Sequence, residues 1–261
     1  MPWAINPVFE PKSTTEPVVD VEAAQADGRN ADGGGSPVPD SKYMPPSDHF
    51  TLHQIFYIFI IDGIGAAIVA GAINFAIAYA LYGLIKNIDQ SPVRLFQLPN
   101  TLAGDTAVTI FIQFLTTWIA ESIIVNRDLK RGGVQPIGFI PEPKWRLLRW
   151  FMFLDRKEET YNVRSVKHWL SYFFSQITRS FILAALAFPF IFGVSVGILT
   201  ALGEREIGDW DWSYPSKWIP EIFKAVQGAV LGLLFTPLMA IFWLSKCGWA
   251  LKTMERQPGT E

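Results

Sequence analysis

The chain has 261 residues, of which 50% are hydrophobic and 18% are charged. Charged residues make up about a quarter of an ordinary soluble domain, so this composition excludes that class. The 22 basic and 24 acidic residues give a net charge of −2, which removes the electrostatic case for a nucleic-acid partner. With Cys247 as the single cysteine, an internal disulfide is excluded.

Residues 1–50 are rich in proline and in acidic side chains. They hold 8 of the 18 prolines, and eight acidic residues against three basic ones. Such a segment buries too little apolar surface to offset the entropy of ordering, so we predict a disordered acidic Pro/Gly-rich tail. A regulatory segment with phosphorylatable serines and threonines is the alternative. Residues 256–261 are expected to form a short C-terminal tail.

Four apolar stretches lie at about residues 55–85, 106–125, 180–202 and 222–244. Each is long enough to cross the ~30 Å hydrocarbon core of a bilayer as a helix. The apolar residues come in unbroken runs and do not alternate, which favours helices over a β-barrel. We therefore predict an all-α fold, a four-span transmembrane helical bundle over residues 51–255.

The distribution of basic residues predicts the orientation of the bundle. Residues 126–171, within the connection 126–179 between spans two and three, hold ten Lys and Arg, whereas the other two connections hold few. Basic loops face the cytosol in multi-span proteins. We therefore expect an integral membrane protein whose middle connection and both termini are cytosolic.

The end of the middle connection has the pattern of an amphipathic helix. Val166, Leu170, Phe173 and Ile177 fall on one side of a helical wheel, and Lys167 and Arg179 fall on the other. We expect this cytosolic helix to lie in the interface and to run into span three. Basic and aromatic residues alternate just upstream, so we predict contacts with the lipid bilayer and its anionic headgroups from Lys144, Trp145, Arg146, Arg149, Trp150 and Lys167.

Small residues at four-residue spacing predict where the spans pack. Close backbone contact through such residues supplies much of the association between helices in lipid. The pattern occurs in spans one, three and four, at Gly63, Ala67, Gly71, Gly193, Gly197, Gly228 and Gly232. These faces suit packing within the chain, and they also suit a homo-oligomer or another membrane protein.

Span two carries polar residues along one side, including Thr106, Thr109, Gln113, Thr117 and Glu121. A polar stripe in lipid must face the bundle or a wet cavity, and ionisable residues at this depth are expensive to bury. We therefore treat Asp62 and Glu121 as a candidate intramembrane polar site, together with Asn74, Gln113 and Thr117. The alternative is that the two acids reach headgroup water, or pair with polar neighbours and fix the helix register.

The loop before span four is acidic and aromatic, from Asp209 to Pro215. Its Trp and Tyr residues are expected to anchor the neighbouring spans at the interface, and an aromatic ligand cage is the alternative. Before span two, the segment from Pro99 to Asp105 reads as a turn and helix cap, in which Asp105 or Thr106 accepts the free amides.

Motifs of enzymes and cofactor sites are absent from the sequence. It contains no phosphate-binding loop, nucleophile elbow or zinc-protease motif, so we expect no catalytic activity and no cofactor. His49 and His53 stand four apart, a spacing that suits a metal, but without a clear third ligand we interpret them as headgroup contacts. Cys247 is expected to be a free thiol, with S-acylation as the alternative.

Four phrases of the sequence carry a family resemblance: Ile61–Gly65, Asn74–Tyr79, Arg94–Asp105 and Gly138–Pro143. Over roughly residues 50–255 the chain resembles the fungal multi-pass membrane proteins grouped as domain of unknown function 2456. The resemblance implies a membrane protein and assigns no functional residue. We therefore expect a non-catalytic structural or adaptor component, and the alternative is a small transporter or channel that uses Asp62 and Glu121.

Overall fold

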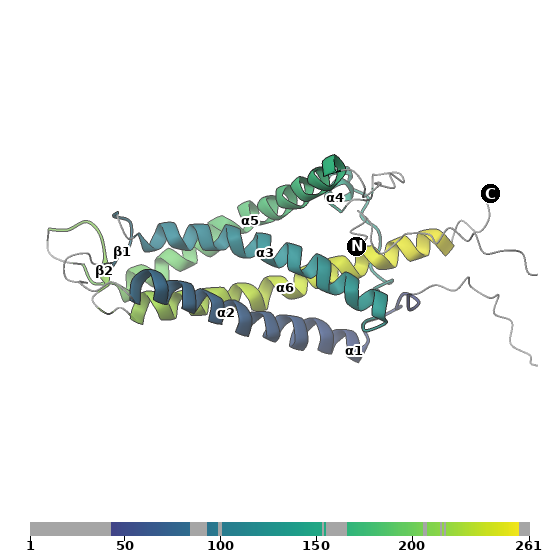
Figure 1. Ribbon diagram of the computed structural model, residues 1–261, viewed down its shortest axis with the longest axis horizontal. Coiled ribbons are helices and arrows are strands. Elements are labelled where there is room, and N and C mark those ends of the chain that lie inside the picture. Colours follow the sequence, from purple (N-terminus) through teal and green to yellow (C-terminus); the bar gives the residue numbers. More distant parts are fainter. Residues whose placement is uncertain are drawn as a thin grey trace, which may run out of the picture.

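The computed structural model describes residues 43–83, 93–98, 101–152, 154, 166–205, 208–214, 216 and 218–255. Long helices lying side by side dominate these residues (Figure 1), so the predicted all-α fold is confirmed. Of the two predicted tails, residues 1–42 and 256–261 lie outside the described residues. The prediction of disorder is wrong for residues 43–50, because the backbone N–H of Ser47 donates to the carbonyl of Pro136 at 2.9 Å and Ser47 is buried.

The first span is a continuous helix that changes its winding along its length. It consists of α1 (Leu52–Ile55), the π-helical segment η1 (Phe56–Ile64), α2 (Gly65–Ala78) and the π-helical segment η2 (Tyr79–Gly83). The helix starts with a capping box, in which the Thr51 hydroxyl accepts from the Gln54 N–H at 3.1 Å and the Gln54 side chain accepts from the Thr51 N–H at 3.0 Å. Wide π-turns of this kind are often found at functional sites.

The other spans are the helices α3 (Leu102–Arg131), α5 (Val166–Leu202) and α6 (Trp218–Glu255). Four stretches are long and apolar enough to cross a membrane: Leu52–Tyr82, Leu102–Arg131, Phe173–Leu202 and Trp218–Thr253. The prediction of four long apolar helices that could span a membrane is therefore confirmed, at the predicted positions. The helices extend beyond the predicted limits because helical hydrogen bonding continues after the apolar stretch has ended.

The ends of α3 are fixed by two short-range signals. The helix begins one turn before the predicted cap, because the hydroxyl of Thr101 accepts from the Gly104 N–H at 3.2 Å. Capping by Asp105 or Thr106 was therefore a wrong prediction. The helix ends at Gly132, whose φ of 69° is in the left-handed region that glycine adopts without strain.

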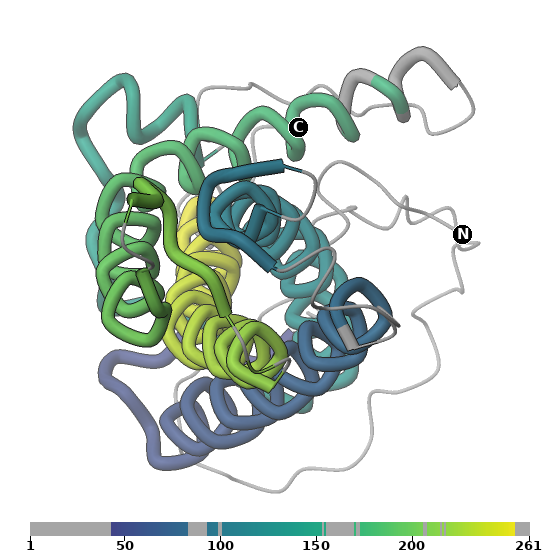
Figure 2. The backbone as a smooth tube through the Cα atoms, turned by 90° about the vertical axis from the view of Figure 1, so that its left-hand side faces the viewer, coloured from purple at the N-terminus to yellow at the C-terminus, as the bar shows by residue number. Residues whose placement is uncertain are grey.

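Helix α6 is the central element of the bundle, and it packs against η1, α2 and α3. Figure 2 looks along the helices and shows α6 in the middle, with α5 lying against α3. The predicted small-residue faces of spans one and four meet: a Cβ atom at Gly232 would lie 2.8 Å from the Ala66 carbonyl and 3.1 Å from the Ala67 nitrogen. Gly63 and Gly71 face Pro237 and Ala225 in the same way.

The predicted contact face of span three is not used within the described part of the chain. Gly193 and Gly197 are exposed, and a Cβ atom at either position would have no neighbour within 4 Å. Helix α5 contacts α3 instead through aromatic side chains, among them Phe111 and Phe181, whose rings stack 4.9 Å apart. Helices α3 and α5 therefore pack through large aromatic rings, whereas α2 and α6 pack through glycines that let their backbones approach.

One end of the bundle is closed by a short antiparallel ribbon, and we call it the β-ribbon end. Strands β1 (Val93–Arg94) and β2 (Ser213–Tyr214) pair there, with Val93 opposite Tyr214. The connections between spans one and two and between spans three and four therefore meet at the same end. This arrangement is the one that a four-span topology requires.

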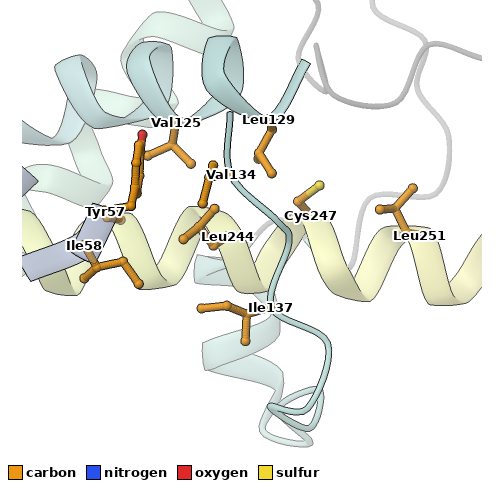
Figure 3. Packing of buried hydrophobic residues seen from close by; sticks show 10 residues of the cluster. Tyr57, Ile58, Val125, Leu129, Val134, Ile137, Leu244, Cys247 and Leu251 are labelled. Atoms are coloured by element: carbon orange, nitrogen blue, oxygen red, sulfur yellow. The ribbon is translucent and has the colours of Figure 1, made fainter. Parts of the chain in front are cut away.

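The opposite end, which we call the α4 end, holds the short helix α4 (Arg146–Phe151) and the C-terminal turns of α6. Behind α3 the chain is irregular, as its glycines and prolines predict, but it is closely packed. Ile137 lies against α6 in the apolar cluster of Figure 3, and a Cβ atom at Gly248 would come within 1.9 Å of the Ile137 carbonyl. This close docking was not predicted.

Candidate functional site

The two acids of the candidate polar site are both buried, Asp62 on η1 and Glu121 on α3. Asp62 is 7% exposed and Glu121 is 4% exposed, and the charge of Asp62 acts on Glu121. One oxygen of each carboxylate, Oδ2 of Asp62 and Oε2 of Glu121, is buried without a hydrogen-bond partner among the described residues. Gly63, next to Asp62, has no side chain and so lets η1 approach Pro237 of α6.

A tyrosine and a third acid extend this site toward the α4 end. The hydroxyl of Tyr57 donates to Oδ2 of Asp128 at 2.8 Å, and the charge of Asp128 acts on both Asp62 and Glu121. Tyr57 is buried, whereas Asp128 is half-buried near the end of α3. We call Tyr57, Asp62, Glu121 and Asp128 the acidic site.

Five polar residues of α3 stand four apart and form a ladder along the helix: Asp105, Thr109, Gln113, Thr117 and Glu121. Neighbours at this spacing are about one turn apart, but each step turns about 40° around the axis, so the ladder drifts by about 160° around α3 from Asp105 to Glu121. The Nε2 atom of Gln113 donates to Thr117 Oγ1 at 3.3 Å. Gln113 and Thr117, which the sequence grouped with the two acids, therefore bond to each other, and among the described residues neither forms a hydrogen bond with Asp62 or Glu121.

The far end of the ladder meets a buried cation. Lys224 of α6 is 0% exposed, and its Nζ lies 3.1 Å from Oδ2 of Asp105 and also donates to the hydroxyl of Thr109. The same carboxylate oxygen of Asp105 accepts from the Tyr82 hydroxyl at 2.9 Å. We call Tyr82, Asp105, Thr109 and Lys224 the lysine site.

Asn74 belongs to neither site. Its Nδ2 donates to the Ala70 carbonyl at 2.9 Å, one turn back in the same helix. Gly228 leaves room for this amide, because a Cβ atom at that position would lie 2.4 Å from Asn74 Nδ2. We therefore correct the prediction that Asn74 shares a polar site with Asp62: it is a packing residue of the α2–α6 contact.

The sequence analysis missed Tyr57, Tyr82, Asp105 and Asp128 as members of the two sites. Both tyrosines are embedded in a long apolar run, where a hydroxyl gives no pattern of its own. Asp105 begins the ladder, and its four-residue spacing to Thr109 and Gln113 was the available signal. An aspartate near the start of a helix is more often a cap, and Asp105 was therefore interpreted as one.

The predicted lipid-contact residues cluster on and before α4. Lys144, Trp145 and Arg146 are exposed, and Trp145 reaches 73%. Arg149 forms an ion pair with Glu142 at 3.5 Å. The side chain of Lys167 lies outside the described residues, although its backbone is part of α5.

The burial of Arg179 contradicts its predicted place on the polar side of the interfacial helix. Helix α5 does run without a break from Val166 into span three, but Arg179 is buried, at 2% exposed. Its guanidinium donates to the carbonyls of Trp150 at 2.8 Å and Phe151 at 2.7 Å, and it covers the Trp150 ring. Arg179 therefore holds the C-terminal end of α4 against α5.

The acidic aromatic loop folds back on the loop before α3. Asp211 is buried and accepts from the backbone N–H groups of Phe96 and Gln97 at 2.9 to 3.1 Å. Asp209 forms an ion pair with Arg94. The Asp211 backbone N–H, followed by the Arg94 side chain, lowers the pKa of Asp209 below its usual value. The acids of this loop thus hold the β-ribbon end together.

The structure also places the histidine pair, His49 and His53, and the single cysteine, Cys247. His49 and His53 are exposed, and the described residues contain no group of three or more His, Cys, Asp or Glu side chains that could hold a metal. Cys247 is a free thiol that is 1% exposed within the apolar cluster of Figure 3. A thiol this well packed is not accessible for acylation in this conformation.

The fold and the buried charges define a helical protein with four candidate membrane spans. Within that class, the model of the family described as protein of unknown function DUF2456 matches residues 149–244. The family resemblance that the sequence indicates is therefore confirmed.

Two fungal proteins are similar to the chain. An uncharacterized protein of Schizosaccharomyces pombe is 34% identical over 206 residues, which cover 78% of this chain and 40% of that protein. An uncharacterized protein of Saccharomyces cerevisiae is 28% identical over 244 residues, which cover 72% of this chain and 76% of that protein. The chain thus spans less than half the length of the first relative. No solved structure matches it.

Proposed function

We propose that this protein conducts protons across its membrane and that Asp62 and Glu121 form the proton-binding site. The observation that carries this proposal is that the carboxylates of Asp62 and Glu121 are both buried, each with an oxygen that has no hydrogen-bond partner among the described residues. Two buried carboxylate oxygens without a partner favour the transport alternative over a purely structural component.

The physical reason is the cost of charge in lipid. An ionised carboxylate away from water is strongly disfavoured unless it is paired or neutralised. A buried carboxyl group without a permanent partner is therefore neutralised by a proton, which it can exchange. The π-helical winding of η1 adds to this interpretation, because Asp62 lies within it.

A structural role would use these carboxylates differently. Acids that only fix helix register are expected to use their oxygens in hydrogen bonds, as Asp105 does with Tyr82 and Lys224. Asp62 and Glu121 each keep a buried oxygen unused, at a point where Tyr57 and Asp128 continue toward the α4 end. A carboxyl group that exchanges a proton is expected to keep one oxygen free of permanent hydrogen bonds in this way.

Proton flux in proteoliposomes tests the proposal. The purified chain is reconstituted with a trapped pH-sensitive dye, and flux is driven by a potassium diffusion potential. We expect Glu121→Gln and Asp62→Asn each to lower the protein-dependent flux at least tenfold. Glu204→Gln, which changes an exposed acid at the β-ribbon end, is the matched control and should leave the flux unchanged. Wild-type flux no greater than that of empty vesicles would refute the proposal.

A second function, that of a non-catalytic adaptor at the membrane surface, is supported by α4. Its exposed Trp145, Leu147 and Leu148 stand beside Lys144 and Arg146, the composition of a segment that lies at anionic headgroups. A dye on Leu147→Cys, in a protein whose only native thiol is buried, should be quenched by brominated lipid. Quenching should increase with the content of phosphatidylserine, and an unquenched dye would contradict this role.

The orientation that we propose for the bundle follows from the rule that connections rich in Lys and Arg face the cytosol. We infer that the α4 end, with the basic middle connection, faces the cytosol, because Lys and Arg are concentrated there. The acidic site then lies toward the cytosolic side of the bundle, and the lysine site toward the opposite side.

A further inference from the structure

Two cations are buried at the α4 end of the bundle, one on α5 and one on α6. Arg179 is 2% exposed and Lys246 is 8% exposed, and the charge of Arg179 acts on Lys246. Like charges that are removed from water disfavour each other, and a nearby anion relieves this repulsion. A pair of this kind therefore favours a negatively charged ligand.

Aromatic contacts join the two cations into one cluster. The Lys246 ammonium lies 5.1 Å from the centre of the Trp243 ring, and the Trp243 and Trp118 rings are 5.4 Å apart. The Phe151 ring lies 5.8 Å from that of Trp118, and the Phe151 carbonyl accepts from Arg179 Nε at 2.7 Å. Arg179 and Lys246 thus border the same aromatic core, where α3, α4, α5 and α6 meet.

Two neutral hydrogen-bond donors of this cluster have no acceptor. The Nε2 atom of Gln176 and the Nε1 atom of Trp243 are buried without a partner among the described residues. Gln176 is 4% exposed, and its Oε1 accepts from Trp118 Nε1 at 2.7 Å, which holds the amide beside the aromatic core. Gln176 stands three residues before Arg179, and Trp243 three before Lys246, so each donor shares a helix face with one cation.

We call Gln176, Arg179, Trp243 and Lys246 the donor cluster, and its chemistry suits a phosphate group. Buried donors normally have an acceptor, so the unused ones indicate a position for a ligand. A phosphate offers several acceptor oxygens on one negatively charged centre, and ammonium and amide N–H groups donate to it. A metal cation does not fit, because donors and positive charges repel it.

The position of the donor cluster along the helices indicates a lipid as the source of the phosphate. Gln176 and Arg179 come just before the apolar stretch 180–202, and Lys246 comes just after the stretch 222–244. In a helix that spans a bilayer, these positions lie where the hydrocarbon meets the headgroups. Basic pockets between membrane helices on the cytosolic side bind the headgroups of anionic lipids.

We propose that the donor cluster binds the phosphate group of an anionic phospholipid at the α4 end. Lys246, Trp243 Nε1 and Gln176 Nε2 donate to the phosphate oxygens. Arg179 adds positive charge, while its hydrogen bonds to main-chain carbonyls of α4 keep it in place. This binding does not depend on the proposed proton conduction, and it uses buried groups that are distinct from the exposed face of α4.

Binding of short-chain lipids to the full chain in maltoside detergent tests the proposal. The probes are dioctanoyl phosphatidic acid, dioctanoylglycerol, which has the same chains without the phosphate, and inorganic phosphate. Microscale thermophoresis gives the dissociation constants, and a ligand that binds only the folded state also raises Tm. We expect phosphatidic acid to bind about tenfold or more tightly than either other probe.

Two substitutions test the donors. Lys246→Met removes the ammonium and should weaken the binding of phosphatidic acid about tenfold, whereas Lys246→Arg keeps the charge and should retain it. Trp243→Phe removes the indole N–H, keeps an aromatic ring and should weaken binding severalfold. Arg131→Met is the matched control, because Arg131 is exposed at the end of α3, and it should bind like the wild type. Gel filtration in detergent identifies the folded variants.

Three results would overturn the proposal. The first is equal binding of phosphatidic acid and dioctanoylglycerol by the wild type. The second is wild-type binding in folded Trp243→Phe and Lys246→Met, because the buried donors would then be structural. The third is equal weakening by Arg131→Met and Lys246→Met, which would indicate attraction to surface charge in general. Tight binding of inorganic phosphate that depends on Lys246 would support the phosphate site and replace the lipid by a soluble ligand.

Discussion

Gly228 of α6 lies so close to Asn74 of α2 that a Cβ atom at position 228 would come within 2.4 Å of the amide nitrogen and 2.8 Å of the Ala70 carbonyl. A backbone carbonyl in a helix cannot move aside as a flexible side chain can. The substitution Gly228→Ala should therefore separate α2 from α6 and destabilise the protein by about 1–3 kcal/mol. Unfolding monitored in detergent micelles measures this change.

Gly193 provides the control for this substitution. It also lies in a long helix, but a Cβ atom there would have no neighbour within 4 Å. Gly193→Ala should be neutral or stabilise by up to about 1 kcal/mol, because alanine is the better helix former. Equal destabilisation by both substitutions would contradict a specific α2–α6 contact at Gly228.

Arg179 should control the position of α4. Its guanidinium donates to the Trp150 and Phe151 carbonyls, so Arg179→Met removes both hydrogen bonds while keeping most of the apolar volume. We expect the amides of α4 to exchange hydrogen at least tenfold faster in this variant. Arg146→Met, at an exposed position of the same helix, should leave the exchange unchanged. Unaltered exchange in Arg179→Met would show that α4 is held by other contacts.

Much of the fold could be predicted because the length of an apolar run decides whether a helix crosses a membrane. The spacing of Gly63, Ala67 and Gly71 also indicated which face of the first span packs closely, although not that its partner is α6. The site was harder to predict. That Asp62 and Glu121 share a level of the bundle depends on how two helices are rotated and shifted against each other, and no local pattern records this.

Arg179 and Asp105 show a second limit of the sequence. Arg179 was placed with Lys167 on the polar side of the helical wheel. Its partners are main-chain carbonyls of α4, which have no sequence signal. Asp105 was interpreted as a cap because short acids favour helix starts. In each case a contact with a distant element overrode the local preference.

The ion pair of Asp209 with Arg94 should make the β-ribbon end sensitive to acid. The N–H of Asp211 and the side chain of Arg94 lower the pKa of Asp209 from its ordinary value of 3.8. A lowered pKa means that the carboxylate contributes stability above pH 3.8 and that this contribution is lost as the pH falls through the lower, folded-state value. Asp209→Asn should therefore unfold at a lower temperature than wild type at neutral pH.

The same two proteins should become similar at low pH, where Asp209 of the wild type is protonated as well. Thermal unfolding of both in detergent, measured from pH 7 down to about pH 2, follows this convergence. Amide exchange over residues 93–98 provides a local readout of the same loop. A difference between the two proteins that stays constant over this range would mean that the charge of Asp209 does not stabilise the β-ribbon end.

The proposed orientation of the bundle predicts which positions react with reagents from each side of the membrane. Lys144 is exposed at the α4 end and Glu204 is exposed at the β-ribbon end. In a Cys247→Ala background, we expect Lys144→Cys to react with a membrane-impermeant maleimide only after the cytosolic side is opened. Glu204→Cys should react from the opposite side, because β1 and β2 join the connections there. The reverse labelling pattern would invert the direction of the proposed proton path, and labelling of both positions from one side would contradict a four-span topology.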